Sequence, residues 1–186
     1  SILKPCINCS SDEFKIEEVS QNKFGIRYSL SSLKNVGDEC IKKIVQIRKK
    51  EGLFKNIDDL LNKVSYGLIT KKTFESLIKS GALDSLENNR NKLFKSIELL
   101  ISHAQTLEKD KITNQQNLFN ETNENQLLIN LPDTQDWSAQ EKLNNEFSSL
   151  GLYLSSHPLN SYLEILKKIE VKNSLEIFEE PHIYFG

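Results

Sequence analysis

The sequence lacks several residue types that would define its class. It has no methionine and only three cysteines among 186 residues. Because a natural chain starts with methionine, we expect a section of a longer protein or a processed product. Three cysteines do not build the disulfide framework of a small secreted domain. There is neither a signal-peptide pattern nor an apolar run near the roughly 20 residues of a membrane helix, so we expect a cytoplasmic protein without a membrane partner.

Residues that bind metals or perform catalysis are also scarce. Cys6 and Cys9 form one C-x-x-C pair, and the three histidines are scattered. A structural zinc site takes four such ligands, so we expect no metal and interpret these cysteines as small residues of an N-terminal loop. Adjacent acidic pairs such as Asp58-Asp59 project in different directions, which disfavours a two-magnesium site. The sequence therefore predicts no catalytic residue and no cofactor.

Charge is distributed unevenly along the chain, although the net charge is only −2. Residues 34–105 contain 14 basic and 9 acidic side chains, a net of +5, whereas residues 106–186 contain 6 and 13, a net of −7. A basic section of this kind is typical of a polyanion-binding surface. Solvated helix faces would give the same balance, so charge alone leaves both interpretations open.

The hydropathy pattern predicts a mainly α fold with an N-terminal β-hairpin. Residues 13–18 and 24–30 alternate polar and apolar side chains around a polar turn. The apolar period then changes to that of helices, with Asn and Thr residues at capping positions. Four helices are expected, namely residues 37–50, 56–64, 71–79 and a longer helix capped by Asn88.

The chain changes composition after these helices. Thirteen of the 23 residues between 113 and 135 are Asn, Gln or Thr, which cannot bury enough apolar surface to offset ordering. Ser138 to Glu141 form a capping-box pattern that predicts a helix to about Ser149, ended by Gly151. A last helix is expected near 161–168, and residues 174–186 are strand-like. The predicted sections are 1–33 (loop and β-hairpin), 34–108 (tandem helical hairpins), 109–136 (flexible linker) and 137–186 (a helical segment).

The segment from Leu33 to Gly37 predicts a tight turn at the start of a basic helix. Free backbone N–H groups at the positive end of a helix dipole form a phosphate site. The segment resembles the helix-hairpin-helix DNA-binding motif, with Asn35 in place of the first glycine; asparagine tolerates a left-handed backbone. An ordinary capped helix would also fit. The DNA-binding residues expected here are Lys34, Asn35, Val36, Gly37, Lys42 and Lys43.

A second glycine-centred turn lies within residues 77–86. Backbone amides and nearby basic side chains bind phosphates without contacting the bases, so they do not distinguish sequences. Two such hairpins would suit the two strands of a duplex. A simple helix C-cap at the glycine is the alternative. The DNA-binding residues expected here are Lys79, Ser80, Gly81, Ala82, Arg90 and Lys92.

A succession of motifs resembles the alpha subunit of bacterial DNA polymerase III. The matching segments, in order, are residues 5–10, 14–17, 26–30, 33–37, 54–60, 77–86, 89–90, 141–143 and 150–159. The resemblance covers about residues 2–165; Cys9 departs from it, and the last twenty residues match poorly. It implies a tandem helix-hairpin-helix domain on duplex DNA before an OB domain, with other replicase subunits as partners. The polymerase aspartates and their Mg²⁺ would lie outside this chain.

The segment from Gln115 to Phe119 resembles the short peptide by which bacterial polymerases bind the sliding clamp. Leu118 and Phe119 would act as apolar anchors, while the Gln115 amide would form hydrogen bonds at the pocket rim. A five-residue match also arises by chance, which is the alternative.

These observations together predict sequence-independent duplex DNA binding and sliding-clamp tethering within a replicative DNA polymerase. One alternative is a helical adaptor that binds only protein, and salt-dependent binding of duplex DNA would separate it from our prediction. The other alternative is a DNA-binding fragment of a repair nuclease, which metal-dependent nicking would reveal.

Overall fold

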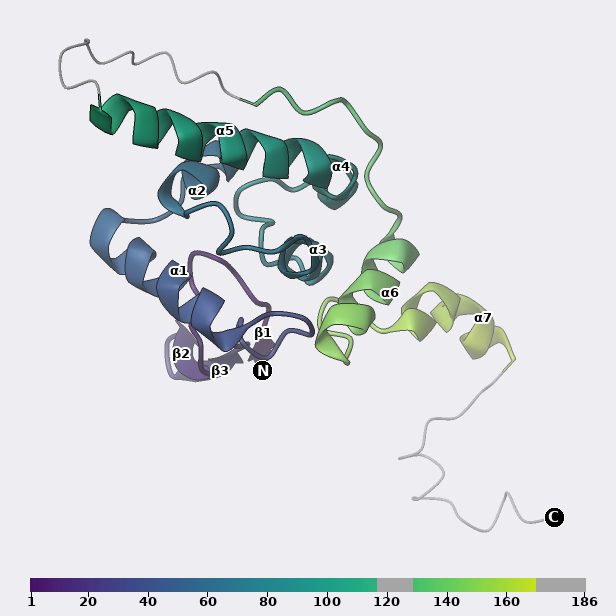
Figure 1. Cartoon of the computed structure of the whole chain (residues 1–186). Helices are drawn as coiled ribbons and strands as arrows, with labels where there is room; N and C mark the ends of the chain where they lie inside the picture. Colours follow the sequence, from purple (N-terminus) through teal and green to yellow (C-terminus); the bar gives the residue numbers. More distant parts are fainter. Residues whose placement is uncertain (117–128, 170–186) are drawn as a thin grey trace. The chain divides into compact units, whose positions relative to one another are not determined.

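The computed structural model describes residues 1–116 and 129–169 (Figure 1). It contains two compact units, one spanning Ser1–Ser155 and one that begins at Ser156. The described part of the first unit has a three-stranded sheet and six α-helices. The second contains a short 3-10 helix and one α-helix. The mainly α class with an N-terminal β-hairpin is therefore confirmed.

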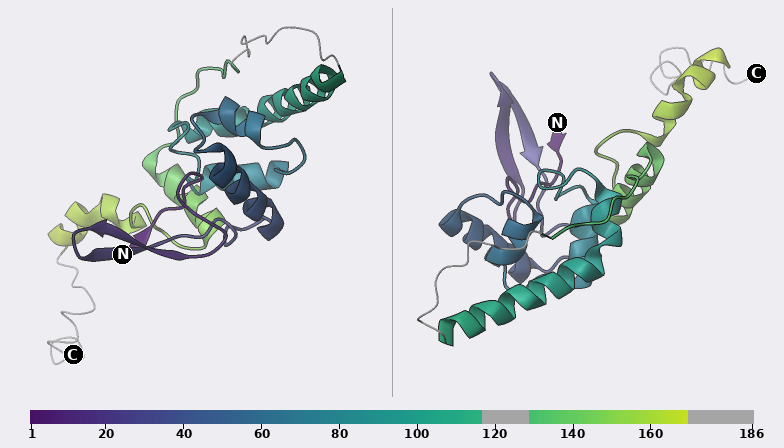
Figure 2. Two further views of the ribbon diagram at one scale, coloured as in Figure 1. Left: turned by 90° about the vertical axis from the view of Figure 1, so that its left-hand side faces the viewer. Right: turned by 90° about the horizontal axis from the view of Figure 1, so that it is seen from above.

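The small sheet is built on the predicted hairpin. Strands β2 (Lys15–Ser20) and β3 (Lys23–Arg27) pair antiparallel, and Asn22 in their turn has φ of 62°, a conformation that asparagine tolerates. Strand β1 (Ile2–Leu3) adds to β3 in parallel and was not predicted, because two residues are too few to show alternation. Figure 2 shows the hairpin extending away from the helices.

Three helices follow close to the predicted positions. Helix α1 (Asp38–Glu51) ends at Gly52, which has φ of 85°. Helices α2 (Ile57–Lys63) and α3 (Lys71–Lys79) are capped as expected, because the side chains of Asn56 and Thr70 accept hydrogen bonds from backbone N–H groups in their first turns.

The predicted fourth helix is in fact two helices. Helix α4 (Arg90–Lys95) is capped by Asn89 rather than by Asn88, and α5 (Ile97–Gln116) follows after a break at Ser96. The Ser96 N–H donates to the carbonyl groups of both Leu93 and Lys92, which tightens the end of α4. Helix α5 also runs through residues 109–116, which we had assigned to the linker.

Residues 129–137 lie against the helices instead of forming a free linker. The Ile129 N–H donates to Asp58 Oδ1 at 3.0 Å, and the Asn89 side chain donates to the Thr134 carbonyl group at 2.5 Å. The Trp137 ring lies 5.3 Å from the Phe94 ring, centre to centre. The described part of the predicted linker is thus attached along α2 and α4.

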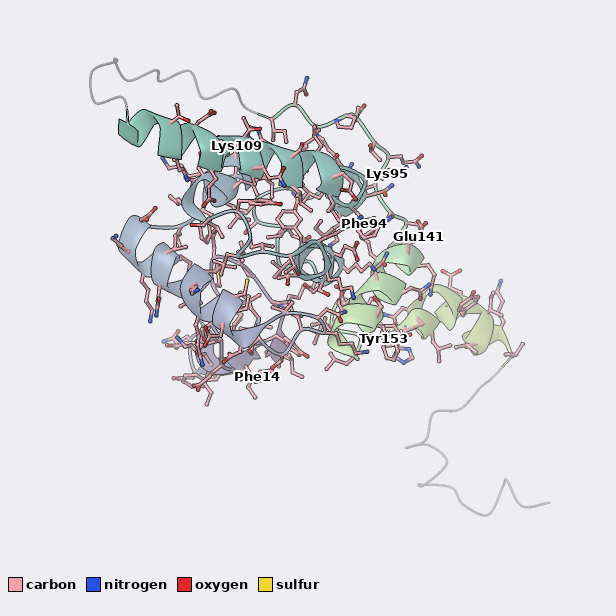
Figure 3. The ribbon with its side chains drawn as sticks, viewed as in Figure 1. Phe14, Phe94, Lys95, Lys109, Glu141 and Tyr153 are labelled. Carbon is pink, nitrogen blue, oxygen red and sulfur yellow. The ribbon has the colours of Figure 1, made fainter. Side chains whose placement is uncertain are left out.

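Helix α6 (Ala139–Leu150) begins and ends as predicted. Ser138 and Glu141 form a reciprocal capping box, in which the Glu141 carboxylate (labelled in Figure 3) accepts the Ser138 N–H at 2.8 Å. Gly151 closes the helix in the left-handed conformation, with φ of 80°. The Lys34 N–H donates to the Ser149 carbonyl group at 3.0 Å, which joins α6 to the turn before α1.

The core of the first unit lies among helices α1 to α5. The side chains predicted to face inward are buried or packed against the core, including Phe74, Leu77 and Ile78 of α3 and Leu93, Ile97 and Leu100 of α4 and α5. Ile7 and Leu30 bring the N-terminal segment into the same core, each with no exposed surface. The N-terminal segment around these two residues is therefore packed with the helical hairpins.

The second unit begins within the section that we had predicted as one helical segment. A 3-10 helix (Pro158–Tyr162) leads directly into α7 (Leu163–Lys168), and the His157 side chain accepts the Leu159 N–H at 3.2 Å as a cap. The predicted strand-like residues 174–186 lie outside the described residues. Within residues 1–116 and 129–169, no helix has the length and apolar character that crossing a membrane would require.

Candidate nucleic-acid interface

The first predicted hairpin is an exposed, left-handed turn. Asn35 has φ of 62°, and the Val36 N–H closes the turn onto the Leu33 carbonyl group at 3.3 Å. Leu33 is buried, whereas Lys34, Asn35 and Gly37 are exposed. Gly37 has φ of −77° and serves as the N-cap of α1, so the special backbone position belongs to Asn35. The structure confirms the left-handed asparagine and shows an ordinary backbone conformation at Gly37.

Two side chains of helix α3 form hydrogen bonds with the backbone of this turn. The Ser76 hydroxyl donates to the Lys34 carbonyl group at 2.6 Å, and the Thr73 hydroxyl donates to the Asn35 carbonyl group at 3.3 Å. The inward carbonyl groups are therefore satisfied by the helix, which fixes the outward side of the turn relative to the start of α3. A surface that is already ordered in the free protein loses less conformational entropy when it binds a ligand.

The N-terminus of α1 already has negative charge of its own. Asp38 and Glu39 occupy its first turn, and Lys42 forms an ion pair with Asp38 at 2.6 Å. Hydrogen bonds from Lys42 and then Ser31 lower the pKa of Asp38, so this carboxylate is charged at neutral pH. Anions near a helix N-terminus satisfy its dipole, and they would repel a phosphate at that end. Lys42 is thus a weaker candidate than we predicted, and phosphate binding at the α1 amides is disfavoured.

Lysines beside the turn provide a better basis for phosphate contact. Lys34 of the turn, Lys43 of α1 and Lys72 of α3 are all exposed. The first turn of α3 contains no acidic residue, unlike that of α1. Lys72 directly precedes Thr73, which bonds to the turn, so the start of α3 lies next to the first hairpin. Lys72 was not among the predicted site residues.

The second predicted hairpin is buried rather than exposed. Ser80 and Ala82 have 1% and 0% exposed surface. The Gly81 N–H donates to the Ile78 carbonyl group and the Ala82 N–H to that of Leu77, both at 3.0 Å, which is the hydrogen-bond pattern of a Schellman helix end. The Ala82 carbonyl group accepts the Ile7 N–H at 2.7 Å. This turn is a covered C-cap, so the prediction that Ser80, Gly81 and Ala82 contact phosphate is not supported.

The Arg90 side chain is buried in an ion pair and is not available at the surface. Its side chain is only 5% exposed, and its Nε and Nη2 atoms donate to the Asp84 carboxylate at 2.7 and 2.5 Å. Its Nη1 atom approaches the Lys79 carbonyl group at 3.4 Å. A bidentate pair of this kind uses the geometry that would otherwise hold a phosphate. The prediction of Arg90 as a DNA contact is therefore corrected.

The other two basic residues near this turn, Lys79 and Lys92, each interact with another side chain. Lys79 Nζ lies 5.1 Å from the ring centre of Phe94, and Lys92 Nζ lies 3.6 Å from the Glu87 carboxylate. Both side chains are only partly exposed, unlike Lys34. The predicted residues therefore do not form two equivalent hairpins, and the first hairpin is the accessible one.

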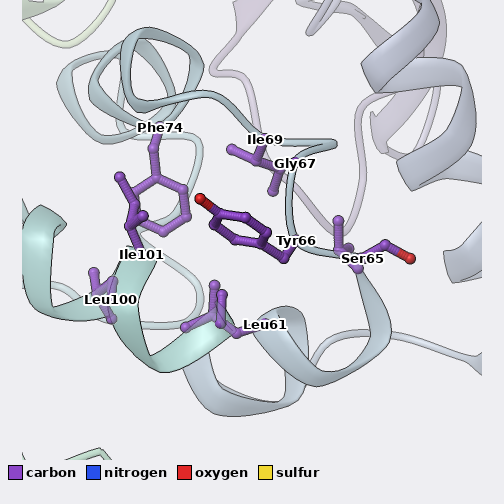
Figure 4. Close-up of a pocket in the computed structure, with 10 residues that line it drawn as sticks. Leu61, Ser65, Tyr66, Gly67, Ile69, Phe74, Leu100 and Ile101 are labelled. Carbon is purple, nitrogen blue, oxygen red and sulfur yellow. The ribbon is translucent and has the colours of Figure 1, made fainter. Parts of the chain in front are cut away.

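The turn between α2 and α3 was not predicted to belong to the site. Gly67 has φ of 89°, and a Cβ atom added there would meet no other atom within 4 Å. The Tyr66 ring lies at a small apolar pocket against α5 (Figure 4). The turn faces Lys43 and Lys50 of α1 across an open groove. A glycine between two capped helices was the available sequence signal. Glu51 also lines this groove, so basic and acidic side chains meet there.

The predicted clamp-binding residues cannot be placed on this surface. Leu118 and Phe119 lie outside the described residues, and so does the Gln115 side chain. Elsewhere in the chain, residues 1–116 and 129–169 contain no group of three or more His, Cys, Asp or Glu side chains that could hold a metal ion.

Comparisons with known proteins agree with the fold described above. The helix-hairpin-helix motif family matches residues 1–93, half of the chain. The DNA polymerase III subunit alpha of Buchnera aphidicola is 36% identical over 174 residues, which cover 89% of this chain and 14% of that protein. The subunit of Borreliella burgdorferi is 33% identical over 178 residues, which cover 94% of this chain and 15% of that protein.

The subunit of Caulobacter vibrioides is 29% identical over 168 residues, which cover 90% of this chain and 14% of that protein. The chain thus spans about a seventh of the length of these relatives. Both halves of the chain take part in these similarities, whereas the motif family accounts for the first half only. The chain belongs to the helix-hairpin-helix motif family, in the form found within one section of bacterial DNA polymerase III alpha subunits.

Proposed function

We propose that this chain holds duplex DNA for a replicative DNA polymerase, without reading its sequence. The observation that supports this proposal is the exposed Lys34-Asn35 turn, which α3 fixes through two hydrogen bonds, together with the exposed side chains of Lys43 and Lys72. The Lys34, Lys43 and Lys72 ammonium groups would contact phosphates, because each is a compact charge on a flexible stem. Contacts of this type position a protein on DNA and have no base preference.

Phosphate contacts of this kind predict weak, salt-sensitive binding. Three neutralised phosphates would give a slope of about −3 for the logarithm of the association constant against that of salt concentration. Dissociation constants of roughly 10⁻⁴ to 10⁻⁶ M at physiological salt are typical of sequence-independent binding. Such affinity suffices within a polymerase, where other contacts to DNA act together with this one.

Fluorescence anisotropy with the 186-residue chain tests this function. Two labelled duplexes of unrelated sequence should bind with the same affinity, and both affinities should fall along the same slope as salt rises. A salt-independent affinity, or no binding to either duplex at millimolar protein, would favour the adaptor alternative. Nicking of a supercoiled plasmid on addition of Mg²⁺ would favour the nuclease alternative.

The chemistry of DNA synthesis belongs, in this proposal, to other sections of the polymerase. Nucleotidyl transfer requires carboxylates that converge on Mg²⁺. The relatives contain about six times as much sequence outside the matched region as within it. We place the polymerase aspartates and their Mg²⁺ there, and we expect the complete enzyme to act in the bacterial cytoplasm with other replicase subunits.

Tethering to the sliding clamp is a second proposed function, and it is supported by the motif at Gln115, Leu118 and Phe119. A short peptide that offers only two apolar anchors should bind with micromolar or weaker affinity. When such a segment is tethered beside a DNA-bound polymerase, effective concentration compensates for that weakness.

A synthetic peptide spanning residues 110–124 provides the test. It should bind a bacterial sliding clamp in titration calorimetry, and replacing Leu118 and Phe119 together with alanine should abolish binding. Asn117→Ala is the matched control and should bind like the parent peptide. Equal binding by the double variant, or no binding by any peptide at millimolar concentration, would show that the motif is a chance match.

A further inference from the structure

Cys6 and Cys9 lie at the two ends of a single hydrogen-bonded turn. The Cys9 N–H donates to the Cys6 carbonyl group at 3.1 Å, and the Ser10 N–H donates to the same group at 2.8 Å. A turn closed in this way keeps its first and fourth Cα atoms within about 7 Å. A disulfide spans Cα separations of roughly 4.4 to 6.8 Å. The backbone of this turn therefore brings the two cysteines close enough for a disulfide.

The rest of the protein holds this turn in place. The Ile7 N–H donates to the Ala82 carbonyl group at 2.7 Å, and the Ile7 side chain has no exposed surface. The Asn8 side chain donates to the Phe54 carbonyl group at 2.8 Å and accepts the Phe54 N–H at 2.9 Å. The two residues between the cysteines are thus anchored, which keeps the thiols together without a covalent bond.

The surroundings leave one thiol accessible and one partly covered. Cys9 is exposed, whereas Cys6 is partly buried and its Sγ atom lies 3.7 Å from the Ser85 hydroxyl. Burial and then the hydrogen bond with Cys6 raise the pKa of the Cys9 thiol, although the charge of Arg27 acts in the opposite direction. The reactivity of this pair therefore depends on proximity more than on an unusually acidic thiol.

We propose that Cys6 and Cys9 form an oxidisable dithiol, which closes into an intramolecular disulfide by exchange with a low-molecular-weight disulfide. The exposed Cys9 thiolate attacks one sulfur of the small disulfide, giving a mixed disulfide and releasing one small thiol. The Cys6 thiolate then attacks the Cys9 sulfur and releases the second small thiol. The protein loses two electrons and two protons, and the small disulfide is reduced to two thiols.

The position of the dithiol gives its oxidation a structural consequence. The disulfide would close a loop around Ile7 and Asn8, the residues that attach the N-terminal segment to α3 and to the end of α1. A metal site is a weaker interpretation, because no third ligand accompanies the pair within residues 1–116 and 129–169. Cys40 is 8% exposed and lies in the core, so it serves as an internal control.

Mass spectrometry after incubation with glutathione disulfide tests the proposal on the 186-residue chain. The oxidised protein should be about 2 Da lighter, and a peptide map should join Cys6 to Cys9. Cys40→Ser should show the same change. Cys6→Ser should instead gain about 305 Da, because the mixed disulfide on Cys9 then has no partner to resolve it.

A trivalent arsenical provides a second readout, because phenylarsine oxide binds stably only where two thiols can reach one arsenic atom. The native chain and Cys40→Ser should each bind one equivalent, and Cys6→Ser and Cys9→Ser should bind none. Circular dichroism of each variant would establish that it is folded. The proposal is overturned if the native chain forms only mixed disulfides, if Cys40 takes part in the disulfide, or if neither reagent reacts with the folded chain.

Discussion

Asn35 occupies the left-handed position of the first hairpin, with φ of 62°. A β-branched residue is a genuine outlier there, so Asn35→Val should lower the free energy of unfolding by about 1 to 3 kcal/mol. Gly37→Ala is the matched control, because Gly37 has φ of −77° and open space around it. The free energy of unfolding of Gly37→Ala should differ from that of the native chain by less than about 1 kcal/mol. Alanine is a poorer N-cap than glycine, but it also lowers the entropy of the unfolded chain, and the two effects offset each other. Urea unfolding measures both, and a larger loss in Gly37→Ala would contradict the assignment.

Gly81 combines a left-handed backbone with a close neighbour. A Cβ atom built there would lie 2.6 Å from Arg90 Cζ and would displace the guanidinium group from Asp84. Gly67 has a similar φ but an empty surrounding. We expect Gly67→Ala to cost about 1 to 2 kcal/mol for the backbone alone, and Gly81→Ala to cost at least about 2 kcal/mol more because a buried pair is broken. Thermal unfolding of the two variants would compare them, and equal losses would contradict this role of Arg90.

The sequence could identify residues such as these more readily than it could assign their roles. The motif pattern correctly located the turn at Asn35, because asparagine and glycine are the residues that tolerate φ > 0. It also included Gly37, which has an ordinary backbone conformation, and it offered Arg90 as a phosphate contact, whereas Arg90 pairs with Asp84 in the structure. Whether a glycine needs its freedom, or an arginine faces solvent, depends on neighbours that are distant in sequence and therefore absent from a local pattern.

At the scale of elements, Asp136 attaches the start of α6 to α4. Its carboxylate accepts the Asn91 N–H at 3.2 Å and the Trp137 N–H at 2.8 Å, and it pairs with Lys142. Burial acts to raise the pKa of Asp136, but the Lys142 pair and the two N–H groups outweigh it and lower the pKa below its ordinary value. The stabilisation is therefore present above about pH 4 and is lost as pH falls through the lowered pKa.

This linkage can be tested by urea unfolding that is followed through Trp137, the only tryptophan of the chain. Asp136→Asn should be less stable than the native chain at pH 7. The difference should shrink as pH falls below about 4 and should vanish only below the lowered pKa of the folded-state carboxyl group. Asp133→Asn, on the same segment but exposed, is the matched control and should show no such difference. A difference that stays constant with pH would contradict the role of the charge.

Helices were largely predictable from the sequence because caps and apolar periodicity are local. Thr70, Asn56 and the Ser138 capping box each mark a helix start that the structure confirms. The break at Ser96 was not predicted, because serine neither caps nor stops a helix strongly in an otherwise regular apolar stripe. The attachment of residues 129–137 was also missed, since single hydrogen bonds and one aromatic contact leave no periodic signal.

At the scale of the whole molecule, one of the two predicted hairpins is accessible and the other is covered. The first hairpin is exposed and held by α3, whereas the second is covered by the N-terminal segment and by the Arg90 pair. The succession of motifs indicated the family, which the similarity to DNA polymerase III alpha subunits confirms. It could not indicate which hairpin remains open, because burial follows from tertiary packing.

Charge reversal at the first hairpin tests the central claim most directly. The site variant replaces Lys34, Lys43 and Lys72 with Glu. The control variant makes the same change at Lys15, Lys95 and Lys109, which are also exposed; Lys95 and Lys109 are labelled in Figure 3. Both variants have the same net charge, so general electrostatic attraction falls equally in the two.

Duplex affinity is then measured by anisotropy at several salt concentrations, with circular dichroism to verify folding. The site variant should lose at least about tenfold in affinity, and its salt slope should approach zero. The control variant should keep a slope near that of the native chain. Equal losses in the two folded variants would contradict the assignment of DNA binding to the first hairpin.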